Sequence, residues 1–279
     1  MSKRCRVWNQ NSYEKRIKQG RGSGECGTYS PWITVQNFSS RGSVSRLRGW
    51  KTNRVHHFMS NNELLYFYLL EWSDEVIDIR EQYPLLDVFA TIEIAKSAGI
   101  MHPYDRKSGF PYVLTTDFLI TTKNGLKART IKESHELDNS RVLEKLEIER
   151  RYWNERNVDW RVVTEREINR TKAKNVEWLH TAKMLSGLPY DDVLMQSIVS
   201  EIIRVYRETQ RPILGICDHI DQIFATHPGT GLAVFKYLVA NKHVSLDINK
   251  PLVLTDWREV DIAIAVGAEG VTENWRATV

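Results

Sequence analysis

Asp117 is an acid in the middle of a segment that is otherwise rich in β-branched, aromatic and aliphatic residues. Residues 112–122 predict a strand because such side chains suit a pleated backbone. An Asn124-Gly125 turn follows, and residues 127–132 predict the returning strand of a hairpin. The hairpin brings Asp117 close to the end where Thr130 and Lys132 share a face. An acid and a lysine so placed can act on a phosphate, or they can form an ordinary cross-strand ion pair.

A second acid, Glu63, follows Ser60 and precedes the apolar residues 64–72. That segment predicts a helix that is apolar nearly all round and is therefore buried. Ser60 and Glu63 match a capping box, in which Glu63 only accepts a hydrogen bond from the backbone of Ser60. The segment alone leaves both interpretations of Glu63 open, a helix cap and a metal ligand.

Glu63, Asp117 and Lys132 together could cleave a phosphodiester bond. Hard Mg²⁺ prefers carboxylate oxygens, and an ammonium group beside it can polarise the attacking water and stabilise the pentacovalent phosphate. This layout resembles the PD-(D/E)xK restriction-endonuclease-like core. We therefore expect an α/β core over residues 61–185, with Glu63, Asp117 and Lys132 as catalytic residues. Glu63, Asp117 and Thr130 are the expected ligands of Mg²⁺, for which Mn²⁺ could substitute.

The elements around these residues alternate as an α/β core requires. Residues 76–85 predict a strand that ends at its proline, and a short helix is expected around residues 91–98. Residues 143–153 predict an amphipathic helix with charge pairs four residues apart, and residues 158–164 predict a further strand.

The positive charge of the chain is concentrated at its N-terminal end. Residues 1–60 contain twelve Lys and Arg residues and two Glu residues, a net charge of +10, although the whole chain has only +4. This density, interleaved with aromatic side chains, favours contact with the phosphates of DNA over a disordered, solvated tail. We expect residues 1–60 to form a DNA-contacting arm, with Arg46, Arg48, Lys51 and Arg54 as candidate phosphate contacts.

Composition excludes several other classes of protein. A chain of 279 residues with 42% hydrophobic content suits two domains. It has no long apolar span and no signal-peptide core, so a soluble, cytoplasmic protein without membrane contact is expected. Association with the nucleoid when active is expected of a protein that contacts DNA. Cys5, Cys26 and Cys217 form no CxxC pair, and no histidines form HExxH, which argues against disulfides and zinc. Gly229-Thr230-Gly231 lacks the lysine of a P-loop.

Several segments resemble the TnsA endonuclease family of Tn-seven-type heteromeric transposases, including CRISPR-associated ones. The resemblance is carried by residues 60–63, 116–119, 131–132, 143–153, 164–169 and 175–179, and it covers residues 25–180 well. It implies a bacterial endonuclease that cuts the 5′ strands of double-stranded DNA at transposon ends, which permits cut-and-paste transposition. It also implies a TnsB-like transposase, which cuts and joins the 3′ ends, and a TnsC-like ATPase regulator as partners.

The chain departs from that family's pattern at one position of the site. Thr130 stands where the motif usually has Glu or Gln, so it can supply only a hydroxyl or its backbone carbonyl to a second metal. Glu149 lies at a position that the family associates with activity. In this sequence it lies among several charged residues of a helix, so it is either a supporting site residue or a member of a surface ion pair.

The C-terminal part predicts helices near residues 191–207, 216–225 and 231–241, followed by strands at 244–248 and 252–257. Three helices and a hairpin suggest a winged-helix-like domain over residues 186–279. Residues 186–257 have a net charge of −2, so docking of a partner protein is expected there rather than binding of DNA.

Two alternative functions stay open at this stage. One is a free-standing restriction or repair nuclease with the same core. The other is a non-catalytic DNA-binding adaptor with a decayed site, an alternative that Thr130 keeps open.

Overall fold

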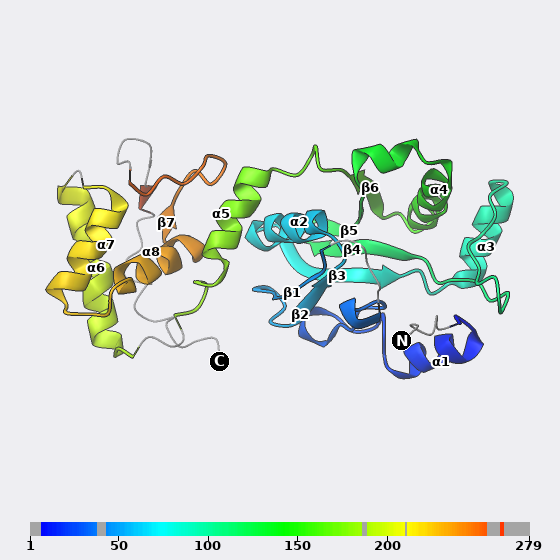
Figure 1. Ribbon diagram of the computed structural model, residues 1–279, viewed down its shortest axis with the longest axis horizontal. Helices are drawn as coiled ribbons and strands as arrows, with labels where there is room; N and C mark the ends of the chain where they lie inside the picture. Colours follow the sequence, from blue (N-terminus) through cyan, green and yellow to red (C-terminus); the bar gives the residue numbers. More distant parts are fainter. Residues whose placement is uncertain (1–6, 38–42, 186–188, 210, 256–262, 265–279) are drawn as a thin grey trace, which may run out of the picture. The chain divides into compact units, whose positions relative to one another are not determined.

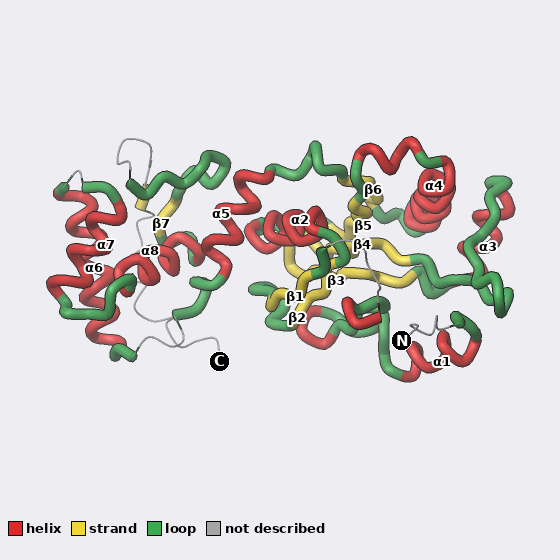
Figure 2. The backbone as a smooth tube through the Cα atoms, viewed as in Figure 1, coloured by secondary structure: helices red, strands yellow, loops and turns green. Residues whose placement is uncertain are grey.

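The protein is described here by a computed structural model that covers residues 7–37, 43–185, 189–209, 211–255 and 263–264 (Figure 1, Figure 2). Its chain divides into two compact units, Met1–Ile168 and Asn169–Val279. The division falls 17 residues before the boundary expected at residue 185. Helix α5 (Arg170–His180) belongs to the second unit, since the Asn175 side chain donates to the carbonyls of Ile248 and Lys250.

The first unit is built on a four-stranded sheet with the order β3-β4-β5-β6. Strand β4 is antiparallel to both β3 and β5, and β6 runs parallel to β5. The predicted hairpin is confirmed, because Thr122 pairs with Gly125 and Phe118 with Arg129 across the Asn124-Gly125 turn. The strands are β3 (Val76–Pro84), β4 (Thr115–Thr122), β5 (Gly125–Ile131) and β6 (Asp159–Val163).

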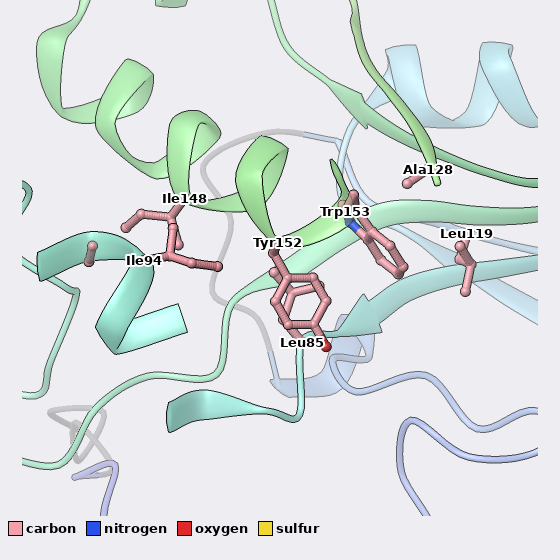
Figure 3. Close-up of a cluster of buried hydrophobic side chains, with 8 residues drawn as sticks. Leu85, Ile94, Leu119, Ala128, Ile148, Tyr152 and Trp153 are labelled. Carbon is pink, nitrogen blue, oxygen red and sulfur yellow. The ribbon is translucent and has the colours of Figure 1, made fainter. Parts of the chain in front are cut away.

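Helices cover both faces of this sheet because successive residues of β4 are apolar on opposite sides. On one face, Phe118 lies against Phe58 of β2 (Val55–Phe58) and Tyr66 of α2 (Asn61–Trp72). On the other face, Leu119 belongs to a buried cluster formed with α3 (Val88–Ser97) and α4 (Ser140–Asn154), shown in Figure 3. The members of this cluster are Leu85, Ile94, Ala95, Leu119, Ala128, Ile148, Tyr152 and Trp153.

The basic N-terminal segment is folded rather than a disordered tail over its described residues. Trp8, Trp32 and Val113 form a small buried cluster, and the Trp8 indole N–H donates to the carbonyl of Pro111 at 2.9 Å. The described residues of this segment therefore pack against the sheet-containing part of the first unit. The segment contains α1 (Gln10–Lys18), the 3-10 turns η1 (Cys26–Thr28) and η2 (Val35–Asn37), and the antiparallel pair β1 (Ser45–Arg48) and β2. The turn η3 (Ser134–Asp138) follows β5.

The second unit contains α5 and the three predicted C-terminal helices, α6 (Asp192–Glu208), α7 (Ile213–Ile223) and α8 (Thr230–Ala240). A short strand β7 (Val244–Ser245) pairs with β8 (Ala263–Ile264). Residues 252–255 form no strand, which differs from the strand expected at 252–257. The end of that expected strand and Cys5 lie outside the described residues.

The expectation of a mixed α/β protein is confirmed by these elements. The finer assignments, a PD-(D/E)xK core and a winged-helix-like second domain, stay predictions. Within the described ranges, no helix combines the length and apolar character needed to cross a membrane.

Candidate active site

Glu63 lies in the first turn of α2, where the cap of the helix fixes its carboxylate. The Ser60 side chain accepts from the Glu63 backbone N–H, as a helix cap should. In return, Glu63 accepts from the Met59 backbone N–H at 2.9 Å and from the Ser60 hydroxyl at 3.1 Å. The predicted capping box is thus present in altered form, with Met59 rather than Ser60 as the backbone donor. Glu63 is buried, and these two bonds fix the orientation of its carboxylate.

Asp117 lies where the ladder between β4 and β5 ends. The last backbone pair is Phe118 with Arg129, and beyond it the Asp117 carboxylate accepts from the Ile131 backbone N–H at 2.7 Å. The Lys132 ammonium nitrogen lies 3.6 Å from the same oxygen, Oδ2 of Asp117. The Lys132 backbone N–H donates to the Val163 carbonyl of β6, which fixes the lysine at this end of the sheet. The sequence-predicted proximity of Asp117 and Lys132 is therefore present.

Glu63 and Asp117 converge on a third residue, Gln82 of β3. The amide nitrogen Nε2 of Gln82 lies 3.4 Å from Oε2 of Glu63 and 3.4 Å from Oδ1 of Asp117. One side-chain amide thus spans two carboxylates that are 54 residues apart in the sequence. Gln82 is not among the site residues predicted from the sequence, because a polar residue does not stand out in a strand that also contains Asp78, Arg80 and Glu81.

The electrostatics of this group favour a bound cation. Burial, and then the charge of Asp117, raise the pKa of the Glu63 carboxyl to about 8. The charge of Asp117 raises the pKa of Lys132, with smaller contributions from Glu149 and Glu63, so the amine stays protonated. The Lys132 side chain is 29% exposed and that of Asp117 only 12%, so the ammonium group is the part that a substrate can reach.

The donor chemistry fits a hard divalent cation. Two buried carboxylates that face one another repel unless a proton or a cation lies between them. Mg²⁺ is commonly held by one or two carboxylates together with water and substrate phosphates. Over the described part of the chain, no cluster of three or more His, Cys, Asp and Glu side chains is arranged to hold a metal. Glu63 and Asp117 would therefore be the side-chain ligands, with the remaining positions left to other oxygens.

Thr130 and Glu149 contact each other in the structure. The Thr130 hydroxyl donates to Oε1 of Glu149, which also accepts from Thr116 at 2.7 Å and from the Trp160 indole at 3.0 Å. The Thr130 hydroxyl is thus hydrogen-bonded to Glu149. The backbone carbonyl of Thr130 stays the predicted metal contact. Glu149 is only 5% exposed, so its interpretation as a surface ion-pair member is wrong. Burial raises the pKa of Glu149 to about 7.

The candidate phosphate contacts divide into two groups. Arg46 and Arg48 are exposed on β1, and the Arg48 side chain contacts only a local partner, Asn53, at 2.9 Å. Lys51 lies in the following turn, half-buried. Arg54 is different, because its guanidinium donates to both carboxylate oxygens of the buried Glu81 and its side chain is only 8% exposed. The Arg54 guanidinium is therefore engaged inside the protein, which argues against the predicted phosphate contact.

Comparison with known families places this α/β unit among endonucleases. Residues 73–165 match the family described as "TnsA-like endonuclease N terminal", and residues 167–248 match "TnsA endonuclease C terminal". The first match contains Gln82, Asp117, Lys132 and Glu149, and Glu63 precedes it. The junction of the two matches agrees with the division of the structure after Ile168.

A full-length relative gives the same result. The chain is 36% identical over 273 residues to the Transposon Tn7 transposition protein TnsA of Escherichia coli. The matched region covers 96% of this chain and 97% of that protein. The chain therefore belongs to the TnsA endonuclease family.

Proposed function

We propose that this protein is a Mg²⁺-dependent DNA endonuclease that cleaves the 5′ strands at transposon ends within a heteromeric transposase. The observation that carries the proposal is the convergence of Glu63 and Asp117 on one amide, with the Lys132 ammonium 3.6 Å from Asp117. Membership of the TnsA family supports an endonuclease, and the name of the Escherichia coli relative supports a role in transposition.

Each of the three residues has a separate task in this proposal. Glu63 and Asp117 would hold Mg²⁺, which when bound lowers the pKa of a coordinated water and polarises the phosphate. The Ile131 N–H fixes one oxygen of Asp117, so the carboxylate keeps its orientation while the substrate binds. Lys132, which stays protonated and is partly exposed, stabilises negative charge that develops on the phosphate oxygens.

The finer fold and the partners belong to the same proposal. A PD-(D/E)xK core is supported by an acid on a buried helix, an acid on β4 and a lysine after β5, all at one end of the sheet. A winged-helix-like second domain is supported by three helices followed by the pair β7 and β8. Double-stranded DNA, a TnsB-like transposase and a TnsC-like ATPase are the proposed partners, with residues 186–279 as the protein-docking part.

Single substitutions test the catalytic assignment. Asp117→Ala and Glu63→Ala should each lower 5′-strand cleavage by orders of magnitude, because each removes a carboxylate that neutralises the metal and the transition state. Lys132→Ala keeps both carboxylates, so it should abolish cleavage while Mn²⁺ still binds. In a transposition assay with the partner proteins, Asp117→Ala should yield cointegrates, since the 3′ ends are still cut and joined.

Matched controls separate catalysis from stability. Glu93→Ala removes an exposed acid of α3, and Lys127→Ala removes a lysine from the opposite end of β5. Both should cleave as the wild type does. Wild-type frequencies of simple insertions from Asp117→Ala, with melting temperatures unchanged, would remove Asp117 from the catalytic site.

A further inference from the structure

Strand β3 contains a backbone irregularity next to the candidate site. Gln82 has a φ of +49°, in the left-handed region that residues with a Cβ rarely adopt. It is buried, and it lies between Glu81 and Tyr83, which pair with Phe118 and Thr116 of β4. A residue in this conformation inside a strand persists only where its surroundings hold it, and such residues occur preferentially at functional sites.

The irregularity breaks the alternation of side chains between the two faces of the sheet. In a regular strand, Glu81 and Gln82 would point to opposite faces. Here Glu81 bonds His56 of β2 and Arg54, the residue before β2. Gln82 bonds Glu63 of α2, so the Glu81 and Gln82 side chains both lie on the face covered by α2 and β2. Tyr83 then returns to the other face, where its ring centroid lies 5.9 Å from that of Trp153 of α4.

Strand β4 shows the same interruption opposite Gln82. Phe118 contacts Tyr66 of α2. Its neighbour Asp117 bonds the same Gln82 amide that bonds Glu63 of α2. Thr116 contacts Glu149 and Trp153 of α4 on the opposite face. Without the break in alternation, Asp117 and Gln82 would not both be directed to Glu63.

Contacts on both sides of Gln82 hold this conformation. The Gln82 backbone carbonyl accepts from the Trp32 N–H at 3.3 Å, and the Tyr29 hydroxyl donates to the Glu81 carbonyl at 3.1 Å. Glu81 itself is fully buried and is bonded by the Arg54 guanidinium and the His56 ring. The N-terminal segment therefore fixes β3 at the residue that spans the two acids.

We propose that Gln82 is a positioning residue of the active site, whose left-handed backbone and side-chain amide orient the Glu63 and Asp117 carboxylates as ligands of a divalent cation. Its amide nitrogen lies 3.4 Å from one oxygen of each carboxylate, so one side chain restrains the two acids relative to each other. The inference rests on the proposed metal-dependent function. It predicts that Gln82 affects metal affinity and not only folding.

The test measures binding of Mn²⁺ alone to the full-length protein, by electron paramagnetic resonance of the free ion. Gln82→Met keeps the length of the side chain but removes both donors, and Gln82→Gly also removes the backbone strain. Both variants should bind Mn²⁺ about 10-fold or more weakly than the wild type, which is typical of losing an outer partner of metal ligands. Gln82→Gly should retain the melting temperature better, because glycine adopts a positive φ freely.

A buried amide in the second unit is the matched control. Asn175 is buried and donates to two backbone carbonyls, so Asn175→Leu removes similar hydrogen bonds without touching the acids. It should lower the melting temperature and leave Mn²⁺ affinity unchanged. Wild-type Mn²⁺ affinity in the folded Gln82→Gly variant would overturn the positioning role.

The same titration separates this proposal from the proposed function. If the wild type binds Mn²⁺ and Asp117→Ala does not, the metal site stands, and the Gln82 variants alone decide the positioning role. If Asp117→Ala binds Mn²⁺ as the wild type does, the metal-dependent function fails and the positioning role fails with it.

Discussion

Asn62 donates a hydrogen bond of 2.6 Å from its side-chain amide to Oε1 of Glu133, which joins the residue before Glu63 to the residue after Lys132. Asn62 is buried in the first turn of α2, and Glu133 precedes the turn η3. The contact therefore links the helix that carries one acid directly to the chain that carries the lysine. Since Glu63 and Lys132 belong to the candidate site, this bond between Asn62 and Glu133, 71 residues apart in sequence, aligns the two site residues.

Substitution of Asn62 should loosen this alignment. Asn62→Ala is expected to lower cleavage about 10-fold, the order found for partners that orient active-site groups, with a loss of stability of about 1 kcal/mol. A double-mutant cycle with Glu133→Ala isolates the bond, because the pair should show a coupling energy in cleavage as well as in unfolding. Gln10→Ala, which removes an exposed amide-to-carboxylate bond in α1, is the control. Strictly additive effects of the Asn62 and Glu133 substitutions would contradict the alignment role.

Metal binding should be linked to pH through Glu63. Its pKa is raised from 4.5 to about 8, so a divalent cation must displace a proton at neutral pH. The apparent affinity for Mg²⁺ or Mn²⁺ should therefore rise as pH increases towards about 8 and level off above it. Calorimetry in buffers of different ionisation enthalpy should detect release of about one proton per metal near pH 6, and Glu63→Gln should remove that release.

The same pKa fixes the sign of the stability change without metal. A carboxyl whose pKa is higher in the folded than in the unfolded state favours folding while it is protonated. The metal-free protein should thus lose stability as pH rises from about 4.5 through about 8, and added Mg²⁺ should restore it. Addition of EDTA at pH 8 should lower the melting temperature of the wild type but not that of Glu63→Gln. A wild-type melting temperature that does not respond to EDTA at pH 8 would argue against this linkage.

Substitutions of the basic residues in the N-terminal segment should have two different effects, weaker DNA binding or lower stability of the fold. Arg46→Ala with Arg48→Ala should weaken DNA binding with little dependence on sequence, and should flatten the slope of log K against log[salt] by up to ~0.9 per lost contact. Arg54→Ala should leave that slope unchanged. It should instead lower the free energy of unfolding by roughly 3 kcal/mol, because the buried Glu81 loses its guanidinium partner and keeps only the His56 ring and the His57 N–H. An unchanged salt slope in the Arg46 and Arg48 variant would remove β1 from the DNA interface.

The sequence predicted those parts of the fold and site that depend on local pattern. The Asn124-Gly125 turn and the β-branched segment before it define the hairpin, and the hairpin alone brings Lys132 to Asp117. The cap at Ser60 likewise follows from residues within one turn of helix. In each case, the determining residues are close in sequence, so the periodicity of the side chains and the residue types of turns and caps are sufficient to predict the structure.

The remaining features depend on contacts between distant segments. Arg54 has the sequence context of a surface cation, and only the folded chain shows that it lies against Glu81. Glu149 lies among charged neighbours in the sequence, yet it faces the sheet, where two threonines and an indole bond it. Gln82 is directed to the acids by a break in alternation, which no period-two pattern can show. A tertiary contact decides each of these positions.

The boundary between the two units can be tested by truncation. Residues Ala173, Val176 and Leu179 of α5 are fully buried in the second unit, so a fragment that ends at residue 185 should expose them. A fragment of residues 1–168 ends before α5 and should remain monomeric, with Mn²⁺ and DNA binding retained and association with the ATPase partner lost. The fragment 1–185 should bind a hydrophobic dye and aggregate, since an unpartnered apolar helix face favours association. Light scattering and dye fluorescence of the two purified fragments measure this difference. Aggregation of 1–168 alongside a monomeric, dye-free 1–185 would instead place α5 with the nuclease unit, at the boundary that the sequence pattern predicted.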